Sequence, residues 1–192
     1  MEVVIIDYGA GNLFSVQKAF ERIGVQVKTS SDFDVISSAD KIIFPGVGHA
    51  KAAMDQLKQS KLDALIPSLK QPVLGICLGM QLLCESTDEG NTKGLGIFNT
   101  KVQRFNDSTL VPQMGWNDVE FKSSVTNQSK LSGAYYFVHS YRAELCSQTI
   151  GVCDYQNPFS AVLQQDNFLA CQFHPEKSGV LGEQFLQTFL AQ

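Results

Sequence analysis

The chain has 192 residues and a formal net charge of −4, with acidic and basic residues interspersed along it. This length is enough for one well-packed domain and short for two. Because no basic stripe is present, binding to nucleic acid or to an anionic membrane is not predicted. No apolar run approaches the ~20 residues that cross a bilayer, and the first residues do not resemble a secretory signal. We therefore expect one cytoplasmic domain over residues 1–192.

The first half of the chain alternates short apolar runs with helical patterns. Residues 3–6 form a continuous apolar run, which is typical of a strand buried on both faces. Residues 13–23 then carry apolar side chains at helical spacing, and Gly24 ends the pattern. The same reasoning predicts strands over 25–29, 42–44 and 73–76, and helices over 50–57, 62–69 and from Cys77 through Leu83. This alternation indicates a parallel sheet with helices on both faces.

The second half of the chain has shorter apolar runs, rich in β-forming residues and separated by turn residues. Strands are predicted over 135–138, 161–163 and 168–171, with a hairpin turn at Asp166-Asn167 between the last two. A final helix carries Val180, Phe185, Leu186 and Phe189. We therefore predict a single α/β domain with a central, mostly parallel sheet flanked by helices, and additional antiparallel strands in the second half.

Cys77 lies in Gly75-Ile76-Cys77-Leu78-Gly79, between a predicted buried strand and a predicted helix. This Gly-x-Cys-x-Gly pattern is the thiol counterpart of the nucleophile elbow. A sharp strand-to-helix turn pushes the nucleophile out of the sheet, and the two glycines remove side chains that would clash. The helix N-terminus favours the reactive thiolate and offers N–H groups to an oxyanion. The alternative is an ordinary buried cysteine in a tight connection.

His174 and Glu176 supply a candidate base and its orienting carboxylate in Phe173-His174-Pro175-Glu176. Pro175 disfavours a helical backbone at His174, so we expect an extended stretch. Residues two apart in an extended chain point to the same side, which places Glu176 beside His174. One ring nitrogen would bind the carboxylate, and the other would act as general base toward Cys77. The alternative is a surface loop with a solvated histidine and carboxylate.

The other cysteines indicate neither a disulfide framework nor a zinc site, because the total is odd and no Cys-x-x-Cys pair occurs. We expect Cys84 to be a core residue inside the helix after Cys77. The remaining three, which we expect to be buried in β-type runs, are Cys146, Cys153 and Cys171. A metal site built from the three histidines is a weaker alternative, because none has helical ligand spacing. Gly9 to Phe14 begins like a dinucleotide fingerprint but has Phe14 at the third glycine position, so no cofactor is expected.

Three sequence strings together resemble the class-I, triad-type glutamine amidotransferases. They are Phe44-Pro45-Gly46-Val47-Gly48, Gly75-Ile76-Cys77-Leu78-Gly79-Met80-Gln81 and Phe173-His174-Pro175-Glu176. The resemblance implies that Cys77 forms a γ-glutamyl thioester and releases ammonia, after which water releases glutamate. It also implies that His174 shuttles the protons and that Glu176 orients it.

The same resemblance implies roles for residues around the triad. Backbone N–H groups of Val47 and Leu78 would form the oxyanion hole, and Gly46 and Gly48 would let the substrate approach the backbone closely. The side chains implied to hold the α-amino and α-carboxylate groups of glutamine are Gln81, His139, Ser140 and Tyr141. Ordinary polar packing is the alternative for Gln81 and Tyr141.

Longer strings resemble one branch of this family. They are Asp7 to Asn12, Pro45 to His49, Gln113 to Asn117, Tyr136 to Arg142 and His174 to Ser178. In that branch the ammonia passes to a separate cyclase subunit with a (β/α)₈ barrel. That subunit makes imidazole glycerol phosphate and an aminoimidazole carboxamide ribonucleotide, which serve histidine and purine synthesis. The resemblance therefore implies a heterodimer.

The residues that resemble the partner interface of that branch are Asn12, Met114, Trp116, Asn117, Tyr136 and Lys177. We expect Trp116 to be an interface anchor in a polar loop, with a core tryptophan as the alternative. The branch also implies weak glutamine hydrolysis without the partner and its ligand, which orient a backbone N–H of the oxyanion strand. Two other interpretations stay open: a class-I glutaminase or γ-glutamyl hydrolase of another pathway, and a catalytically silent binding module.

Overall fold

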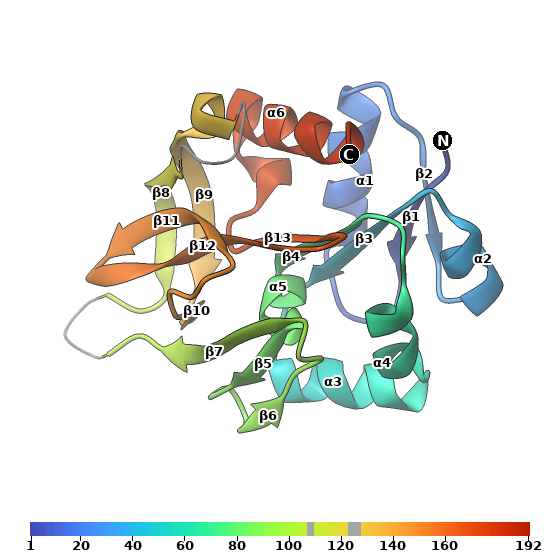
Figure 1. Ribbon diagram of the computed structural model, residues 1–192, viewed down its shortest axis with the longest axis horizontal. Coiled ribbons are helices and arrows are strands. Elements are labelled where there is room, and N and C mark those ends of the chain that lie inside the picture. Colours follow the sequence, from blue (N-terminus) through green and yellow to red (C-terminus); the bar gives the residue numbers. More distant parts are fainter. Residues whose placement is uncertain (107–109, 123–127) are drawn as a thin grey trace.

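Five of the strands in the described residues run parallel and side by side (Figure 1). The computed structural model of the chain describes residues 1–106, 110–122 and 128–192. In spatial order the parallel strands are β2 (Val27–Ser30), β1 (Val3–Ile6), β3 (Lys41–Gly46), β4 (Val73–Cys77) and β13 (Phe168–Cys171). Ile76 of β4 pairs with Pro45 of β3 and with Cys171 of β13. The carboxyl ends of these three strands therefore meet at one edge of the sheet.

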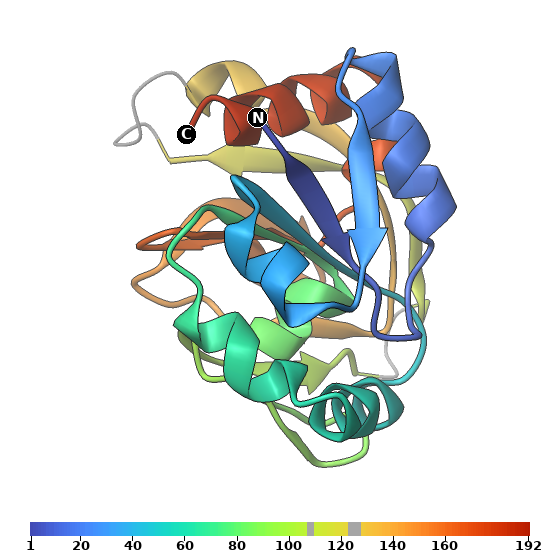
Figure 2. The same cartoon turned by 90° about the vertical axis from the view of Figure 1, so that its right-hand side faces the viewer.

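Helices cover both faces of the parallel strands (Figures 1 and 2). On one face lie α1 (Leu13–Arg22) and α6 (Gly179–Leu190). On the other lie α2 (Phe33–Ser38), α3 (Ala50–Gln59), α4 (Leu62–Leu65), the 3₁₀ turn η1 (Ile66–Ser68) and α5 (Leu78–Leu83). Among the described residues, no helix is long and apolar enough to cross a membrane.

Side-chain alternation along the strands divides the interior into two cores. Val3 and Ile5 belong to the core that includes Phe20 of α1 and Phe185 of α6. Val4 and Ile6 belong to the core that the helices of the opposite face complete. All four β1 side chains are buried, which explains why this strand has a continuous apolar run.

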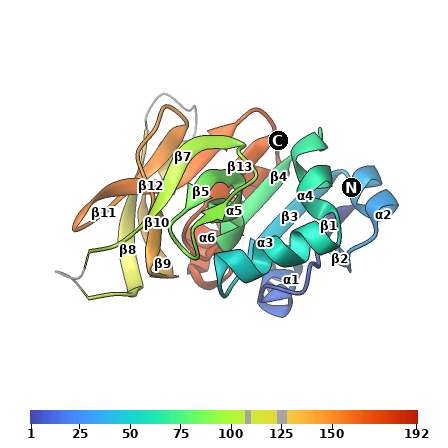
Figure 3. The same cartoon turned by 90° about the horizontal axis from the view of Figure 1, so that it is seen from below.

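The chain after α5 adds a mixed, largely antiparallel extension to the sheet (Figure 3). Its strands are β5 (Cys84–Thr87), β6 (Thr92–Lys93), β7 (Phe98–Arg104), β8 (Gln113–Phe121), β9 (Gly133–His139), β10 (Tyr141–Ala143), β11 (Thr149–Tyr155) and β12 (Asn157–Gln165). Two further 3₁₀ turns are η2 (Gln128–Leu131) and η3 (Pro175–Lys177). The predicted hairpin at residues 166–167 joins the antiparallel strands β12 and β13. The predicted fold class is confirmed.

Three local predictions were incomplete or wrong. Helix α2 was not predicted. Cys84 does not lie inside α5 but begins β5, because the last two carbonyl groups of that helix accept hydrogen bonds from Leu95 and Ile97 and not from a further helical turn. Cys84 is nevertheless fully buried, as expected. Cys146 is only half-buried and lies in the loop after β10, where its backbone N–H donates to Thr149.

Candidate active site

The turn that carries Cys77 is strained in the way a nucleophile elbow requires. Cys77 has φ 54° and ψ −109°, a backbone conformation that residues with a side chain rarely adopt. A Cβ added to Gly79 would overlap the carbonyl oxygen of Phe44, and one added to Gly75 would lie 2.7 Å from Leu83 Cδ1. Gly79 is therefore needed for α5 to pack closely on β3, and Gly75 for it to pack closely on β4, as the sequence pattern predicts.

His174 and Glu176 lie next to each other just after β13. His174 Nδ1 and Glu176 Oε1 are 2.7 Å apart, and both side chains are buried. Since a carboxylate only accepts, Nδ1–H is the donor, and Nε2 remains for chemistry. The prediction of an extended stretch holds only for His174, because Pro175–Lys177 form the 3₁₀ turn η3. The contact therefore comes from a tight turn, not from the two-residue period of a strand.

Charge and burial act in opposite directions on His174. Burial disfavours the imidazolium, but the Cys77 thiolate and the Glu176 carboxylate outweigh it and raise the pKa of His174 above its usual value. Within the described residues, neither His174 Nε2 nor Glu176 Oε2 has a hydrogen-bond partner, although both atoms are buried. The arrangement therefore favours a protonated imidazole beside Cys77, with His174 Nε2 as the ring nitrogen that can exchange a proton.

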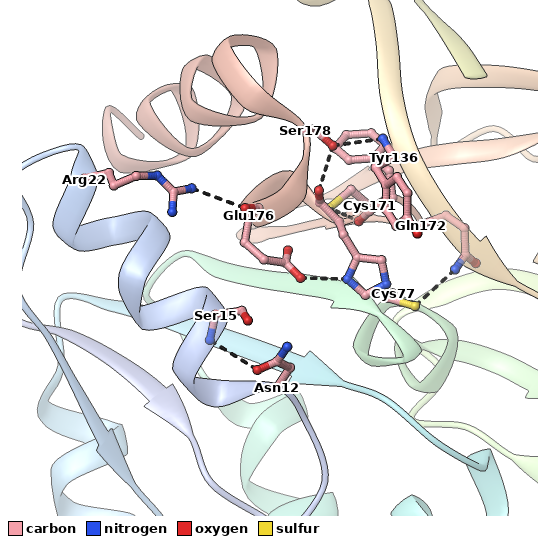
Figure 4. Close-up of polar contacts among 11 residues, drawn as sticks. Asn12, Ser15, Arg22, Cys77, Tyr136, Cys171, Gln172, Glu176 and Ser178 are labelled. Atoms are coloured by element: carbon pink, nitrogen blue, oxygen red, sulfur yellow. Dashed lines mark hydrogen bonds and ion pairs between the residues drawn. The ribbon is translucent and has the colours of Figure 1, made fainter. Parts of the chain in front are cut away.

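Hydrogen bonds from distant segments hold the backbone of the base (Figure 4). His174 N–H donates to Tyr136 O over 2.9 Å. The Ser178 hydroxyl donates to His174 O at 2.7 Å and accepts from Tyr136 N at 3.0 Å. Arg22 of α1 donates to Glu176 O over 3.2 Å and pairs with Glu183 of α6. Strand β9 and helix α1 thus fix the position of the catalytic candidates.

A cavity of about 380 Å³ opens over Cys77. Among the sequence-predicted residues, those that line it are Asn12, Val47, Gly48, Cys77, Leu78, His139, Ser140, Tyr141, His174, Glu176 and Lys177. Those that do not are Gly46, Gln81, Met114, Trp116, Asn117 and Tyr136. The structure therefore gathers the predicted triad, both predicted oxyanion-hole residues and most predicted substrate-binding residues around one hollow.

Gln81 lies buried behind the cavity and is fully engaged through its amide nitrogen. Its Nε2 donates to Tyr141 O and to Gln172 Oε1, both at 2.9 Å. Two amide hydrogens are thereby used, so any further contact of Gln81 must be made by Oε1 as an acceptor.

His139 also bonds to Tyr141 O, through Nδ1 at 2.7 Å. Its ring is surrounded by Phe105, Phe137 and Phe159. This burial is the main reason that the pKa of His139 is lowered to about 4, although the bond to Tyr141 O opposes the shift. His139 is therefore neutral at pH 7, with Nδ1 as its donor nitrogen.

Three of the predicted interface residues, Trp116, Tyr136 and Lys177, form a row that reaches the cavity. Trp116 was predicted to lie in a loop but lies in β8, opposite Tyr136 of β9. Its side chain is 56% exposed. The rings of Trp116 and Tyr136 meet edge-on at 6.1 Å, and Lys177 Nζ lies 5.6 Å from the Tyr136 ring centre. Met114 is exposed on the same strand, and Asn117 accepts from Gln113. A core position for this tryptophan is therefore wrong.

Sequence reasoning missed two polar residues of the site. Gln172 is completely buried and donates to Cys77 Sγ over 3.7 Å. A glutamine within the apolar run 168–173 was the available signal. Glu89 lines the cavity and accepts from Ala50 N–H over 2.7 Å. It lies in a polar turn after β5, so the local sequence carries no comparable signal for it.

In the described part of the chain, no group of three or more His, Cys, Asp or Glu is arranged to hold a metal ion.

Comparison with known proteins places this geometry in context. Residues 4–192 match the family model "Glutamine amidotransferase class-I". "Imidazole glycerol phosphate synthase subunit HisH" of Bacteroides fragilis is 49% identical to this chain, and the alignment covers 99% of each. The protein of that name from Escherichia coli K12 is 48% identical with the same coverage. A crystal structure of a glutamine amidotransferase has the same fold, with a TM-score of 0.77 at 17% identity over 98% of this chain and 97% of that one.

Proposed function

The chain belongs to the class-I glutamine amidotransferases, and we propose that it is the glutamine-hydrolysing subunit of an imidazole glycerol phosphate synthase, acting in histidine biosynthesis. The observation that carries the catalytic part is the placement of Cys77, on a strained turn, beside the His174–Glu176 pair at the adjoining strand end. The observation that carries the pathway is identity near 49% over almost the whole chain to relatives with that name.

In the first half-reaction, the Cys77 thiolate attacks the side-chain carboxamide carbon of glutamine. A C–S bond forms, and the carbonyl π electrons move to oxygen, where N–H groups of Val47 and Leu78 stabilise the charge. When the oxyanion collapses, the C–N bond breaks and the nitrogen takes a proton from the His174 imidazolium. Ammonia leaves, and a γ-glutamyl thioester remains on Cys77.

The second half-reaction restores the enzyme. Neutral His174 removes a proton from water, whose oxygen attacks the thioester carbon. The C–S bond then breaks, glutamate leaves and the thiolate is regenerated beside the imidazolium. Glu176 keeps Nδ1–H engaged throughout, so Nε2 is the nitrogen that exchanges the proton in both steps.

The substrate's α-substituents need partners of opposite polarity around the cavity. Gln81 offers only the acceptor Oε1, because both of its amide hydrogens are used. Glu89 supplies a carboxylate at the cavity wall. Both groups suit the α-ammonium of glutamine, and donors at Ser140 and Tyr141 suit its α-carboxylate. Gly46 and Gly48 leave room for the carboxamide beside the backbone.

A partner surface is proposed next to the cavity mouth. Of the large apolar side chains that the described residues expose, Val47 lines the cavity, Met114 lies opposite the cavity residue Val138, and Trp116 lies opposite Tyr136. Exposed apolar residues around a polar opening are typical of a protein interface, and a tryptophan is a common anchor. We propose that the (β/α)₈-barrel cyclase subunit of imidazole glycerol phosphate synthase docks here, over Trp116, Tyr136, Lys177 and Asn12. It would receive the ammonia directly and, with its nucleotide ligand, activate glutamine hydrolysis.

The test is glutamate release by the purified chain, with and without the cyclase subunit and its nucleotide ligand. We expect a strong increase with both present, and loss of activity in Cys77→Ala. If the partner changes nothing but Cys77→Ala is inactive, the triad survives and the pathway proposal fails. If no mixture with a competent cyclase releases glutamate, the chain is a silent binding module. Trp116→Ala should raise the cyclase concentration needed for half-activation, with unchanged activity at saturation.

A further inference from the structure

We propose that Gln172 is a positioning residue for the nucleophile: its side-chain amide donates to Cys77 Sγ and thereby favours and orients the thiolate. This inference rests on the proposed use of Cys77 as the attacking group. Gln172 is not part of the sequence strings that resemble the family, and it does not line the cavity. Gln172 lies at the end of β13, one strand over from Cys77, and is completely buried.

A continuous chain of hydrogen bonds leads to the sulfur. Tyr141 O accepts from Gln81 Nε2 at 2.9 Å, and the same nitrogen donates to Gln172 Oε1 at 2.9 Å. Gln172 Nε2 then donates to Cys77 Sγ at 3.7 Å (Figure 4). Gln81 and Gln172 are both buried, so water does not compete for these bonds.

The direction of this chain is fixed at its far end. A backbone carbonyl only accepts, so the Gln81 group that faces Tyr141 O must be the amide NH₂. Its second hydrogen then faces Gln172, whose nearest atom must be the carbonyl oxygen. The Gln172 NH₂ is left to face the sulfur, and rotating this amide would bring two NH₂ groups together. The network therefore presents a donor, and never an acceptor, to Cys77.

A donor at this position acts selectively on the charged sulfur. A thiol is a weak acceptor, whereas a thiolate accepts a charge-assisted bond that is stronger in a buried, low-dielectric site. Cys77 is already held in a strained backbone conformation, so a directional bond also limits the rotation of its side chain. His174 cannot do this alone, because it gives up its proton during each cycle and Gln172 does not.

The chain contains a matched control for a purely structural effect. Gln113 is also completely buried, and its Nε2 contacts a cysteine sulfur, that of Cys153, at 3.8 Å. Neither Gln113 nor Gln172 lines the active-site cavity. Replacing Gln113 removes the same kind of contact from the same kind of environment, away from the nucleophile.

The experiment measures iodoacetamide alkylation of Cys77 in the full chain as a function of pH, by peptide mass spectrometry. In Gln172→Met, which keeps the side-chain length without a donor, we expect the alkylation midpoint to rise by at least about half a pH unit. In Gln172→Glu, a carboxylate oxygen faces the thiolate and the midpoint rises further. Gln113→Met leaves it unchanged. Gln172→Glu keeps the test valid if Gln172→Met does not fold.

The outcomes separate this inference from the proposed function. An unchanged midpoint in both folded Gln172 variants overturns the inference, even if the chain hydrolyses glutamine normally. An equal shift in Gln113→Met also overturns it, because the effect is then a general loss of packing. A shift confined to the Gln172 variants supports it, even if glutamine is never hydrolysed, in which case the proposed function fails alone. With active enzyme, kcat should fall three- to tenfold in Gln172→Met with little change in KM.

Discussion

The nucleophile turn (residues 75–79) and the base turn (residues 172–178) follow neighbouring parallel strands but are held in different ways. The nucleophile turn depends on space: Gly75 and Gly79 let β4, α5 and Phe44 of β3 approach closely. The base turn depends on hydrogen bonds from β9 and α1, through Tyr136 and Arg22. The nucleophile turn is therefore fixed by close packing of its backbone, and the base turn by hydrogen bonds from neighbouring segments.

This difference has a consequence for regulation. The nucleophile turn has little freedom, because moving it would separate close-packed backbone. The base turn can respond to changes in β9, because Tyr136 of that strand bonds the backbone N–H of His174 and the side-chain hydroxyl of Ser178. Tyr136 also contacts Trp116 and Lys177 on the proposed partner surface. A partner that binds there has a direct route to the base, besides any effect on the oxyanion strand.

The largest expected effect is that of Gly79→Ala on folding. The new methyl group would overlap Phe44 O, and backbone on both sides leaves no flexible side chain to yield. We expect a loss of more than about 3 kcal/mol in the free energy of unfolding, or no folded protein, measured by chemical denaturation. Gly24→Asn is the control, because nothing lies within 4 Å of a Cβ there and asparagine tolerates its φ of +80°. If the Gly79→Ala variant is as stable as the Gly24→Asn variant, close packing does not fix the nucleophile turn.

The next effect, on the base turn, is that of Glu176→Gln on catalysis. Glutamine fills the same space but removes the negative charge beside His174 Nδ1. Without that charge the imidazolium is less favoured, so the pKa of His174 falls. We expect kcat/KM to drop about 100-fold, equivalent to about 2.7 kcal/mol, and the alkaline limb of its pH profile to move to lower pH. If the alkaline limb of the Glu176→Gln profile stays at the same pH as in the unmodified protein, the assigned role of this carboxylate is contradicted.

The two turns also differ in how far the sequence predicts them. The nucleophile turn is predictable because its determinants, Gly75 and Gly79, lie within a few residues of Cys77. The contact between His174 and Glu176 is present, but the expected extended backbone is confirmed only at His174, since η3 forms at Pro175. The parallel strands β1, β3, β4 and β13 were predictable from continuous apolar runs, which are typical of burial on both faces, whereas the edge strand β2 is partly exposed.

The remaining contacts were not predictable from local patterns. The bonds that Ser178 makes to His174 and Tyr136 depend on which strand lies beside the base turn, and pairing of that kind is set by the whole fold. Trp116 was expected in a loop because glycine and polar residues surround it, yet cross-strand pairing with β9 places it in a strand. Gln172 shows the same limit, because its polarity in an apolar run signals a role but not its partner.

A smaller effect on the base turn is expected from Ser178→Ala. The change removes the buried donor to His174 O and leaves the half-buried Tyr136 N–H without its acceptor. We expect kcat to fall about tenfold, equivalent to about 1.4 kcal/mol, with KM nearly constant, in steady-state assays with the cyclase. Ser178→Thr keeps the hydroxyl and should restore most of the rate. Ser38→Ala is the matched control, since its hydroxyl bonds only carbonyl groups of α2.

The Ser38→Ala control defines the outcome that would contradict this prediction. If Ser178→Ala and Ser38→Ala have the same kcat, the hydrogen bonds from β9 do not position the base, and the contrast between the two turns disappears. A rise in KM with kcat unchanged would point to a role in substrate binding instead.

The smallest effect concerns His139, which lies on β9. Its pKa is lowered, so it is neutral, whereas the pKa of His174 is raised. Burial is the main cause that lowers its pKa to about 4, and the nearby positive charges of His174 and Arg142 act in the same direction. In the unfolded chain His139 binds a proton below about pH 6.5, whereas in the folded chain it stays neutral until about pH 4. Stability is therefore lost as pH falls through this window, by about 1 kcal/mol between about pH 7 and pH 5.5.

His139→Gln tests this directly, because glutamine keeps a donor for Tyr141 O without titrating. Denaturation curves for the variant should lose that part of the pH dependence, while other groups contribute equally to both proteins. Identical slopes for the two proteins would mean that His139 is protonated in the folded state at pH 5.5. A second imidazolium would then lie near His174 and lower its pKa, and the thiolate–imidazolium pair would be weaker than the contrast between the two histidines implies.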